Sequence, residues 1–132
     1  MAANDIEYRD GHDEVDLEQL ARLRDSAGWR GLGEDVLLEQ VRGARFVVSA
    51  WEGRRLVGFA RAISDGVTNG YISTVVVDAD YRGRGVGRRL VQRLVAGRGG
   101  IRWVLHARPE VTGFYAKLGF EAAPDMLWRD RR

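Results

Sequence analysis

A glycine-dense basic turn follows the apolar run Val75–Val77 and opens an amphipathic segment that begins at Val86. Its glycines stand at alternate positions, Gly83, Gly85 and Gly87. Because glycine allows positive φ and close backbone approach, successive N–H groups can converge on phosphate oxygens at the positive end of a helix dipole. No Ser, Thr, Asn or Asp immediately precedes the apolar segment to cap it, so we expect an anion to satisfy its first N–H groups. The turn therefore predicts a pyrophosphate-binding loop.

Read from Arg82, the spacing of this turn is R-x-x-G-x-G. A Walker A loop would need Gly-Lys-Ser/Thr at its end, and a dinucleotide fingerprint counted from Gly83 would need a third glycine where Arg88 stands. The spacing thus excludes both of these nucleotide-binding motifs. The other interpretation is a solvated low-complexity loop, but the turn lies between a strand pattern and a helix pattern rather than within further low-complexity sequence.

At this point the chain resembles the GNAT superfamily of N-acetyltransferases, whose signature is Q/R-x-x-G-x-G/A after an apolar strand. The resemblance implies that the loop binds the pyrophosphate of acetyl-coenzyme A (acetyl-CoA). It also implies that the strand backbone pairs with the pantetheine arm, and that an N–H near Val76 stabilises negative charge on the acetyl oxygen. The cofactor-binding residues expected on this basis are Val75, Val76, Val77, Arg82, Gly83, Arg84, Gly85, Val86, Gly87 and Arg88.

A second motif, the segment 114–120 with sequence F-Y-A-K-L-G-F, is similar to the F-Y-x-K-L-G-F segment that closes many family members. The resemblance implies that Tyr115 is the general acid that protonates the departing CoA thiolate. The alternative is that Tyr115 is only an aromatic residue packed beside Phe114. Because the chain has no cysteine and no evident serine triad, we expect direct attack by a bound amine, without an acetyl-enzyme.

The segments 58–66 and 75–78 resemble more closely the plastid and cyanobacterial type of serotonin N-acetyltransferase and its small bacterial relatives. Those proteins carry G-F-A-R-A-x-S-D and D-V-V-V-D. Two positions depart from this pattern: Thr74 stands where they have the aspartate before the valines, and Arg108 stands where an acidic or amide residue often follows the fifth strand. Water or another group must then accept the proton of the amine, and the resemblance does not name serotonin as the substrate.

Charge is distributed unevenly along the chain, whose formal net charge is +2. Residues 1–44 carry 5 basic and 11 acidic side chains, whereas residues 45–132 carry 16 basic and 8 acidic ones. Every cation except Lys117 is an arginine, which suits bidentate phosphate contacts. Nucleic-acid binding is the competing interpretation, but no aromatic residues interleave the arginines, so it is disfavoured.

The length and composition predict a single domain over residues 1–132. With no cysteine and two histidines that lack clustered partners, the chain is expected to bind no metal. No apolar run has the length of a membrane span and the acidic N-terminus does not resemble a signal peptide, so we expect a cytoplasmic protein. The richness in arginine and glycine suggests a GC-rich bacterial genome. A homodimer is expected from the resemblance alone.

The elements that must position these residues follow the order β-α-α-β-β-β-α-β-α-β-β. This order predicts an α+β protein with a mixed sheet. It is also the order of the GNAT fold, and the resemblance implies that fold here, with a mixed, mostly antiparallel sheet of six or seven strands flanked by about four helices. Strands are expected at 6–9, 46–51, 56–63, 71–78, 101–106, 120–123 and 126–129. Helices are expected at 16–27, in a short segment that ends at Gly43, at 86–96 and at 110–118.

The leading functional hypothesis is acetylation of a primary amine on a small molecule such as an arylalkylamine, a polyamine or an amino-sugar. Two alternatives stay open: acetylation of a macromolecular amine (a protein N-terminus or lysine, or an aminoacyl-tRNA), and a CoA-binding regulatory module without turnover. The family builds its acceptor pocket from the first two helices and the hairpin, where the residues here are ordinary core formers. Trp29 and Phe59 are candidates for an aromatic-amine pocket, with core packing as the alternative.

Overall fold

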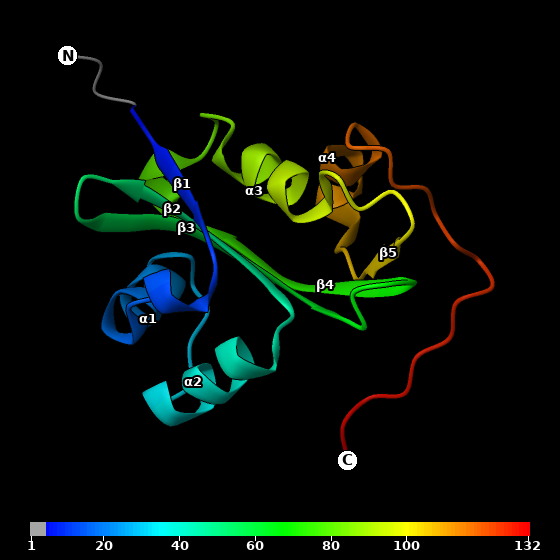
Figure 1. Cartoon of the computed structure of the whole chain (residues 1–132), viewed down its shortest axis with the longest axis horizontal. Coiled ribbons are helices and arrows are strands. Elements are labelled where there is room, and N and C mark those ends of the chain that lie inside the picture. Colours follow the sequence, from blue (N-terminus) through cyan, green and yellow to red (C-terminus); the bar gives the residue numbers. More distant parts are fainter. Residues whose placement is uncertain (1–4) are drawn as a thin grey trace.

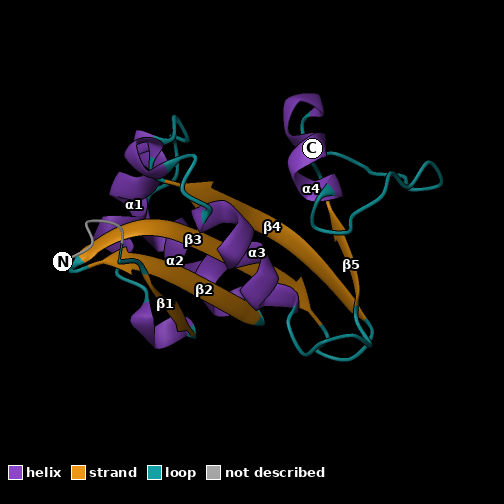
Figure 2. Cartoon of the chain, turned by 90° about the horizontal axis from the view of Figure 1, so that it is seen from above, coloured by secondary structure: helices purple, strands orange, loops and turns teal. Residues whose placement is uncertain are grey.

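The computed structural model describes residues 5–132, which form a mixed sheet with helices on both faces (Figure 1). The strands lie side by side in sequence order: β1 (Glu7–Asp10), β2 (Phe46–Glu52), β3 (Arg55–Ser64), β4 (Asn69–Val77) and β5 (Arg102–Leu105). The first four are antiparallel neighbours, and β5 runs parallel to β4. Figure 2 shows the twist of the long central strands β2, β3 and β4, whose apolar residues suit a sheet covered on both faces.

The helices α1 (Leu17–Ser26) and α2 (Glu34–Gly43) lie on one face of the sheet, and α3 (Val86–Val95) and α4 (Thr112–Ala116) lie on the other (Figure 1). The predicted start of α1 is confirmed, because the Asp16 carboxylate accepts a hydrogen bond from the Gln19 N–H at 3.1 Å. The Gln19 side chain reaches the hairpin between β2 and β3, where it donates to the Arg54 carbonyl and accepts from the Leu56 N–H. One residue thus fixes α1 against the sheet.

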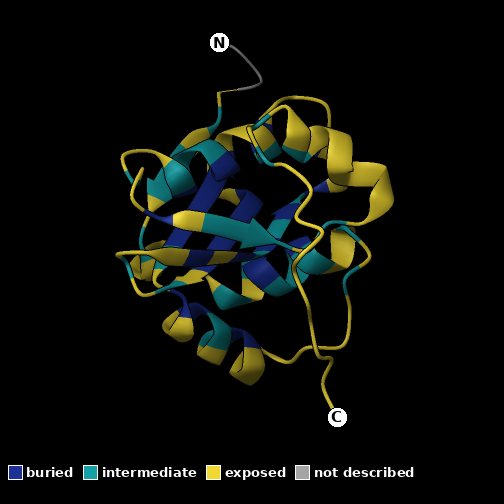
Figure 3. Ribbon diagram, turned by 90° about the vertical axis from the view of Figure 1, so that its right-hand side faces the viewer, coloured by how far each residue is buried: buried dark blue, intermediate teal, exposed yellow. Residues whose placement is uncertain are grey.

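The core has one layer on each face of the sheet. On the α1–α2 face it includes Leu23, Leu37 and Phe59, and on the α3 face it includes Leu90 and Leu94. Figure 3 shows these buried segments enclosed by exposed helix surfaces and loops.

Gly58 of β3 lets α3 approach the sheet closely. A Cβ atom at this position would lie 2.8 Å from Cγ1 of Val86 and 3.0 Å from Cδ1 of Leu90. The close approach sets the height of the α3 N-terminus above β4, because Val86 is the first residue of that helix.

The prediction of six or seven strands is wrong: the described residues form five, and neither 120–123 nor 126–129 is a strand. The backbone here bonds locally instead, with the Phe120 N–H donating to the Tyr115 carbonyl and the Met126 N–H to the Ala123 carbonyl. Pro124 can donate no ladder bond, and β5 is only four residues long. The segment therefore runs as an exposed strap from α4 past β5 to the C-terminus (Figures 1 and 3).

Candidate active site

β4 and β5 separate after four residue pairs. Ile72 lies opposite Leu105 in the last pair, after which β5 ends and β4 continues to Val77. Meanwhile β3 pairs with the other edge of β4 as far as Val77, opposite Gly58. Within the described chain, residues 73–77 thus have one edge paired with β3 and one edge without a strand partner. Such an edge presents backbone N–H and C=O groups to an extended ligand.

A register shift accompanies this separation. Ala62 lies opposite Ile72, whereas its neighbour Arg61 lies opposite Thr74, so Ser73 is an extra residue in β4. An extra residue bends its strand and increases the local twist. The bulge therefore explains why β4 leaves β5 at this position.

The three predicted valines lie on the open segment, and their side chains are core residues. Val76 is buried between the sheet and α1–α2, whereas Val75 and Val77 pack toward α3. The side chain of Val76 is therefore unavailable to a ligand, and those of Val75 and Val77 are only partly exposed.

The glycine-rich loop follows this segment after Asp78 and a turn of 3-10 helix, Ala79–Tyr81, and leads into α3. Gly83 and Gly85 have φ of 78° and 80°, as the alternate glycines predict, whereas Gly87 is the second residue of the helix. Gly87 still serves a close approach, because an added Cβ would lie 3.4 Å from the Phe114 ring and 3.5 Å from Val77. The loop therefore uses two glycines for conformation and one for packing.

The N-terminus of α3 has the features of an anion site. Gly85 is the N-cap, no side chain caps the helix, and its first turn holds no acidic residue. Arg82, Arg84 and Arg88 are exposed, and within residues 5–132 none of them is in a salt bridge. Val86, by contrast, is buried, so only its backbone N–H faces a ligand. Uncapped N–H groups beside free arginines favour bound phosphate.

Asp78 anchors the start of the loop, and the sequence analysis did not identify it. Its side chain is 1% exposed and accepts hydrogen bonds from Arg55 at 2.9 Å, from Arg22 at 3.2 Å and from the Asp80 N–H at 3.0 Å. Burial raises the pKa of Asp78, but the hydrogen bonds from Arg55, Asp80 and Arg22 together outweigh it, so the pKa lies below its ordinary value. The signal in the sequence was an aspartate placed directly after a buried strand.

Tyr81 extends this anchor to the arginines of the loop. Its hydroxyl donates to a Glu52 carboxylate oxygen, and the Arg84 guanidinium stacks over its ring at 4.7 Å from the centroid. The stack holds Arg84 beside the glycines before any ligand binds.

Tyr115 lies in α4 and is half-buried. Its ring meets Phe114 and Phe120 edge to face, with centroids 4.9 Å and 5.7 Å away. Burial raises its pKa, so the phenol holds its proton throughout the neutral range. The residue lines a hollow of ≈ 430 Å³ between β5, α4 and residues 120–126. Phe114 beside it touches Gly87, which brings α4 next to the start of α3.

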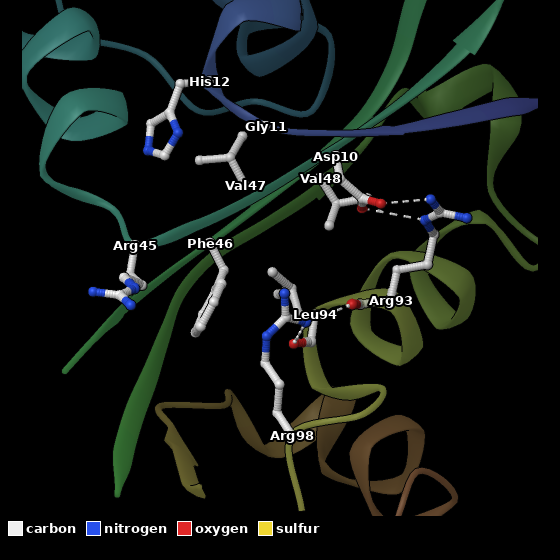
Figure 4. A pocket seen from close by; sticks show the side chains of 10 residues that line it. All are labelled: Asp10, Gly11, His12, Arg45, Phe46, Val47, Val48, Arg93, Leu94 and Arg98. Carbon is white, nitrogen blue, oxygen red and sulfur yellow. Dashed lines mark hydrogen bonds and ion pairs between the residues drawn. The ribbon is translucent and has the colours of Figure 1, made fainter. Parts of the chain in front are cut away.

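A second hollow, of ≈ 250 Å³, lies at the opposite end of α3 and is lined by Asp10, Arg45, Phe46, Arg93 and Arg98 among others (Figure 4). Arg93 pairs with Asp10 there at 2.7 Å. Because a helix rises 1.5 Å per residue, Arg93 at this hollow lies roughly 10 Å along α3 from Val86, where the glycine-rich loop meets the helix. It is therefore distinct from the candidate active site.

In the part of the chain that the structure describes, no three His, Cys, Asp or Glu side chains gather in a group that could hold a metal ion. No helix among the same residues is both long and apolar enough to cross a membrane.

Comparison with known proteins places this site in a family. The model of the Acetyltransferase (GNAT) family matches residues 12–120. Serotonin N-acetyltransferase 2, chloroplastic, of Oryza sativa subsp. japonica is 46% identical over 76 residues, which cover 55% of this chain but only 38% of that protein. The uncharacterised N-acetyltransferase ycf52 of Pyropia yezoensis is 32% identical over 141 residues, covering 96% of this chain and 81% of the other.

Among solved structures, a candidate acetyltransferase from Deinococcus radiodurans R1 superposes with a TM-score of 0.82 at 26% identity, over 98% of this chain and 91% of that one. The matches agree with the open β4 edge and the glycine-rich loop in indicating one class of enzyme. The chain belongs to the GNAT family of acetyltransferases, which act with acetyl-CoA.

Proposed function

We propose that this chain transfers the acetyl group of acetyl-CoA directly to a primary amine of a small molecule. The observation that carries the proposal is the succession of two features: the open backbone edge at residues 73–77 is joined through residues 78–85 to the uncapped N-terminus of α3. An extended pantetheine arm fits the edge, and its pyrophosphate fits the loop. The contacts come from the backbone of Val75, Val76, Val77, Gly83, Gly85, Val86 and Gly87 and from the side chains of Arg82, Arg84 and Arg88.

In the proposed step, the amine nitrogen attacks the thioester carbon, the C–S bond breaks and a new C–N bond forms. Backbone N–H groups near Val76 stabilise the negative charge on the acetyl oxygen, an effect that can contribute about 3 kcal/mol. The CoA sulfur leaves with the bonding electron pair and takes the phenolic proton of Tyr115. Burial raises the pKa of Tyr115, so the phenol still holds its proton at neutral pH when the sulfur departs, as this role requires.

The proton of the amine requires an acceptor. Thr74 carries no basic group and its hydroxyl is engaged by Arg61, so we propose that water accepts the proton. Tyr115 then regains a proton from solvent, so transfer to a neutral amine releases no net proton, whereas an amine that binds as its ammonium form releases one.

The acceptor classes proposed are arylalkylamines, polyamines and amino-sugars. The rice relative, named as a serotonin N-acetyltransferase, supports the first class over the 55% of this chain that it matches. A second rice relative, named as a glucosamine 6-phosphate N-acetyltransferase, is 54% identical over 54 residues and supports the third. A homodimer and a cytoplasmic location stay predictions.

The test is thiol release from acetyl-CoA by the purified protein against arylalkylamines, polyamines, aminoglycosides and short peptides, with a control that lacks acceptor. We expect release above the control for at least one small amine. Turnover of peptides alone would replace the small-molecule acceptor with a macromolecular one. If no acceptor gave thiol release above the control, but acetyl-CoA still raised the melting temperature, the protein would be a binding module instead of an enzyme.

A further inference from the structure

A buried arginine lies beside the open edge of β4 and has only neutral partners. Arg61 of β3 is 8% exposed. Its Nε donates to the Thr74 hydroxyl at 2.8 Å and its Nη2 donates to the Ser73 hydroxyl at 3.0 Å. Both hydroxyls orient the guanidinium but leave its charge unbalanced.

No acidic side chain balances this charge: within residues 5–132, Arg61 makes no salt bridge. Burial, and then the positive charge of Arg24 of α1, lower the pKa of Arg61. Arg24 stacks over Trp29 at 5.3 Å and, within the same residues, also makes no salt bridge. The other group that shifts the pKa of Arg61 is Tyr71, a phenol, which raises it. Removing a cation from water without a counterion is costly, so this site favours an anion.

The guanidinium also keeps a hydrogen-bonding nitrogen for that anion. Nη1 of Arg61 donates to no described residue. Within residues 5–132, the one fully buried side-chain N or O atom without a hydrogen-bond partner is Glu52 Oε2. Nη1 of Arg61 has no partner either, so it is not fully buried. Nη1 therefore reaches the protein surface, where a carboxylate or phosphate oxygen can meet it.

The position of Arg61 relates it to the reaction proposed above. Thr74 lies directly opposite Arg61 in the β3–β4 pair, and Ser73 and Thr74 are the first two residues of the open edge. An anion on Arg61 is thus next to the backbone along which the acetyl group would lie. Arg24 lies in the last turn of α1, and Trp29 follows the end of that helix and packs in the core layer that also holds Phe59 and Val76; both residues are half-buried.

We propose that the acceptor amine carries an acidic group, a carboxylate or a phosphate, which Arg61 binds with Arg24 close by. The inference rests on the proposed transferase function and narrows its substrate class. Thr74 is central to it, because an aspartate at this position would itself be a counterion for Arg61. The related proteins that carry D-V-V-V-D have that aspartate, whereas this chain leaves the guanidinium for its substrate.

The test compares amines that differ only in the acidic group: tryptophan with tryptamine, ornithine with putrescine, and glucosamine 6-phosphate with glucosamine. The first two pairs probe a carboxylate and the third a phosphate. We expect kcat/KM to favour the acidic member of at least one pair by about tenfold or more, the effect of a charged hydrogen bond. Arg61→Met and, independently, Thr74→Asp should bring that ratio close to one. Arg42→Met, which removes an exposed charge from α2, is the matched control and should keep the wild-type ratio.

Calorimetric binding of the same amines to the protein loaded with CoA separates the two proposals. Equal or better turnover of the neutral members would overturn the anion site and leave the transferase intact. Tighter binding of acidic members that depends on Arg61, without turnover of any amine, would support the anion site and overturn the transferase. Neither turnover nor preferential binding would overturn both.

Discussion

Ile72 lies opposite Leu105 in the last residue pair between β4 and β5, and beyond it β4 runs for five more residues with its outer edge open. This open segment ends at Asp78, whose two arginine partners fix the point where the glycine-rich loop begins. Residues 78–85, which include a turn of 3-10 helix at Ala79–Tyr81, thereby connect the strand edge to the N-terminus of α3 from a fixed point.

Hydrogen exchange should detect a ligand on that surface. When acetyl-CoA binds, we expect amide protection to rise at residues 73–77 and at the start of α3, because backbone N–H groups there gain partners. The distant edge strand β1 is the internal control and should exchange as before. Protection confined to the hollow of Figure 4 would place the ligand elsewhere.

Replacing Tyr115 with Phe should lower kcat by about 10² or more, the contribution of a positioned general acid. The ring packing against Phe114 and Phe120 is kept, so the affinity for acetyl-CoA should change little. Steady-state thiol release gives kcat, and a binding isotherm gives the affinity. Tyr8→Phe, which removes a phenol from the distant β1, is the matched control. An unchanged kcat in the Tyr115 variant would remove Tyr115 from the chemistry.

The pH profile offers a separate test of the same residue. Because burial raises the pKa of Tyr115 above its ordinary value of about 10, the proton donor is present throughout the neutral range and is lost only as pH rises through that raised pKa. We expect kcat to show an alkaline limb above pH about 10 in the wild type. The Phe variant should lack this limb. Its persistence in that variant would assign the titration to another group.

The positive φ of Gly85 predicts a specific sensitivity of the loop. Gly85→Ala places a Cβ on a residue with φ of 80°, which costs about 1–2 kcal/mol of stability, and it should also weaken acetyl-CoA binding. Gly99→Ala is the control, because Gly99 is exposed, has no positive φ and no atom within 4 Å of an added Cβ. Thermal melts with and without acetyl-CoA measure both effects. Identical behaviour of the two variants would contradict the role assigned to the loop conformation.

Asp78 should stabilise the fold in a pH-dependent way. Its folded-state pKa is depressed, so its contribution is fully present above the unfolded value of about 3.9 and is lost as pH falls through the folded pKa. Because Arg55 and Arg22 are 47% and 40% exposed, we expect Asp78→Asn to cost about 1–3 kcal/mol at neutral pH. Urea melts should show this difference shrinking in acid. Asp80→Asn, at an 82% exposed side chain, should have little effect; a loss equal to that of Asp78→Asn would indicate a general charge effect.

Local signals in the sequence predicted most of the elements. The alternate glycines predicted the positive φ at Gly83 and Gly85, and Asp16 followed by Gln19 predicted the start of α1. Both depend on neighbours along the chain. The prediction of strands at 120–123 and 126–129 was wrong, because residue alternation shows which residues suit a strand but not whether a partner edge is within reach. Here Pro124 and the local hydrogen bonds of Phe120 and Met126 prevent pairing.

The parts of the site that depend on register were not visible in the sequence. Arg61 lies within a β-rich run, where an arginine usually faces solvent; only the pairing with Thr74 shows that it is buried. Asp78 likewise depends on Arg22, which is distant in sequence and comes from α1. Such contacts follow from the packing of α1 on the sheet, which no local pattern specifies.

In the proposed reaction, the acetyl group passes from acetyl-CoA to an amine without forming a bond to the protein. Mass spectrometry of the protein and of the amine, after incubation with acetyl-CoA and an acceptor that releases thiol, tests this directly. Direct transfer should give acetylated amine and free CoA in equal amounts, with the protein unmodified. A protein that carries the acetyl group itself, or thiol release without any acetylated amine, would contradict it.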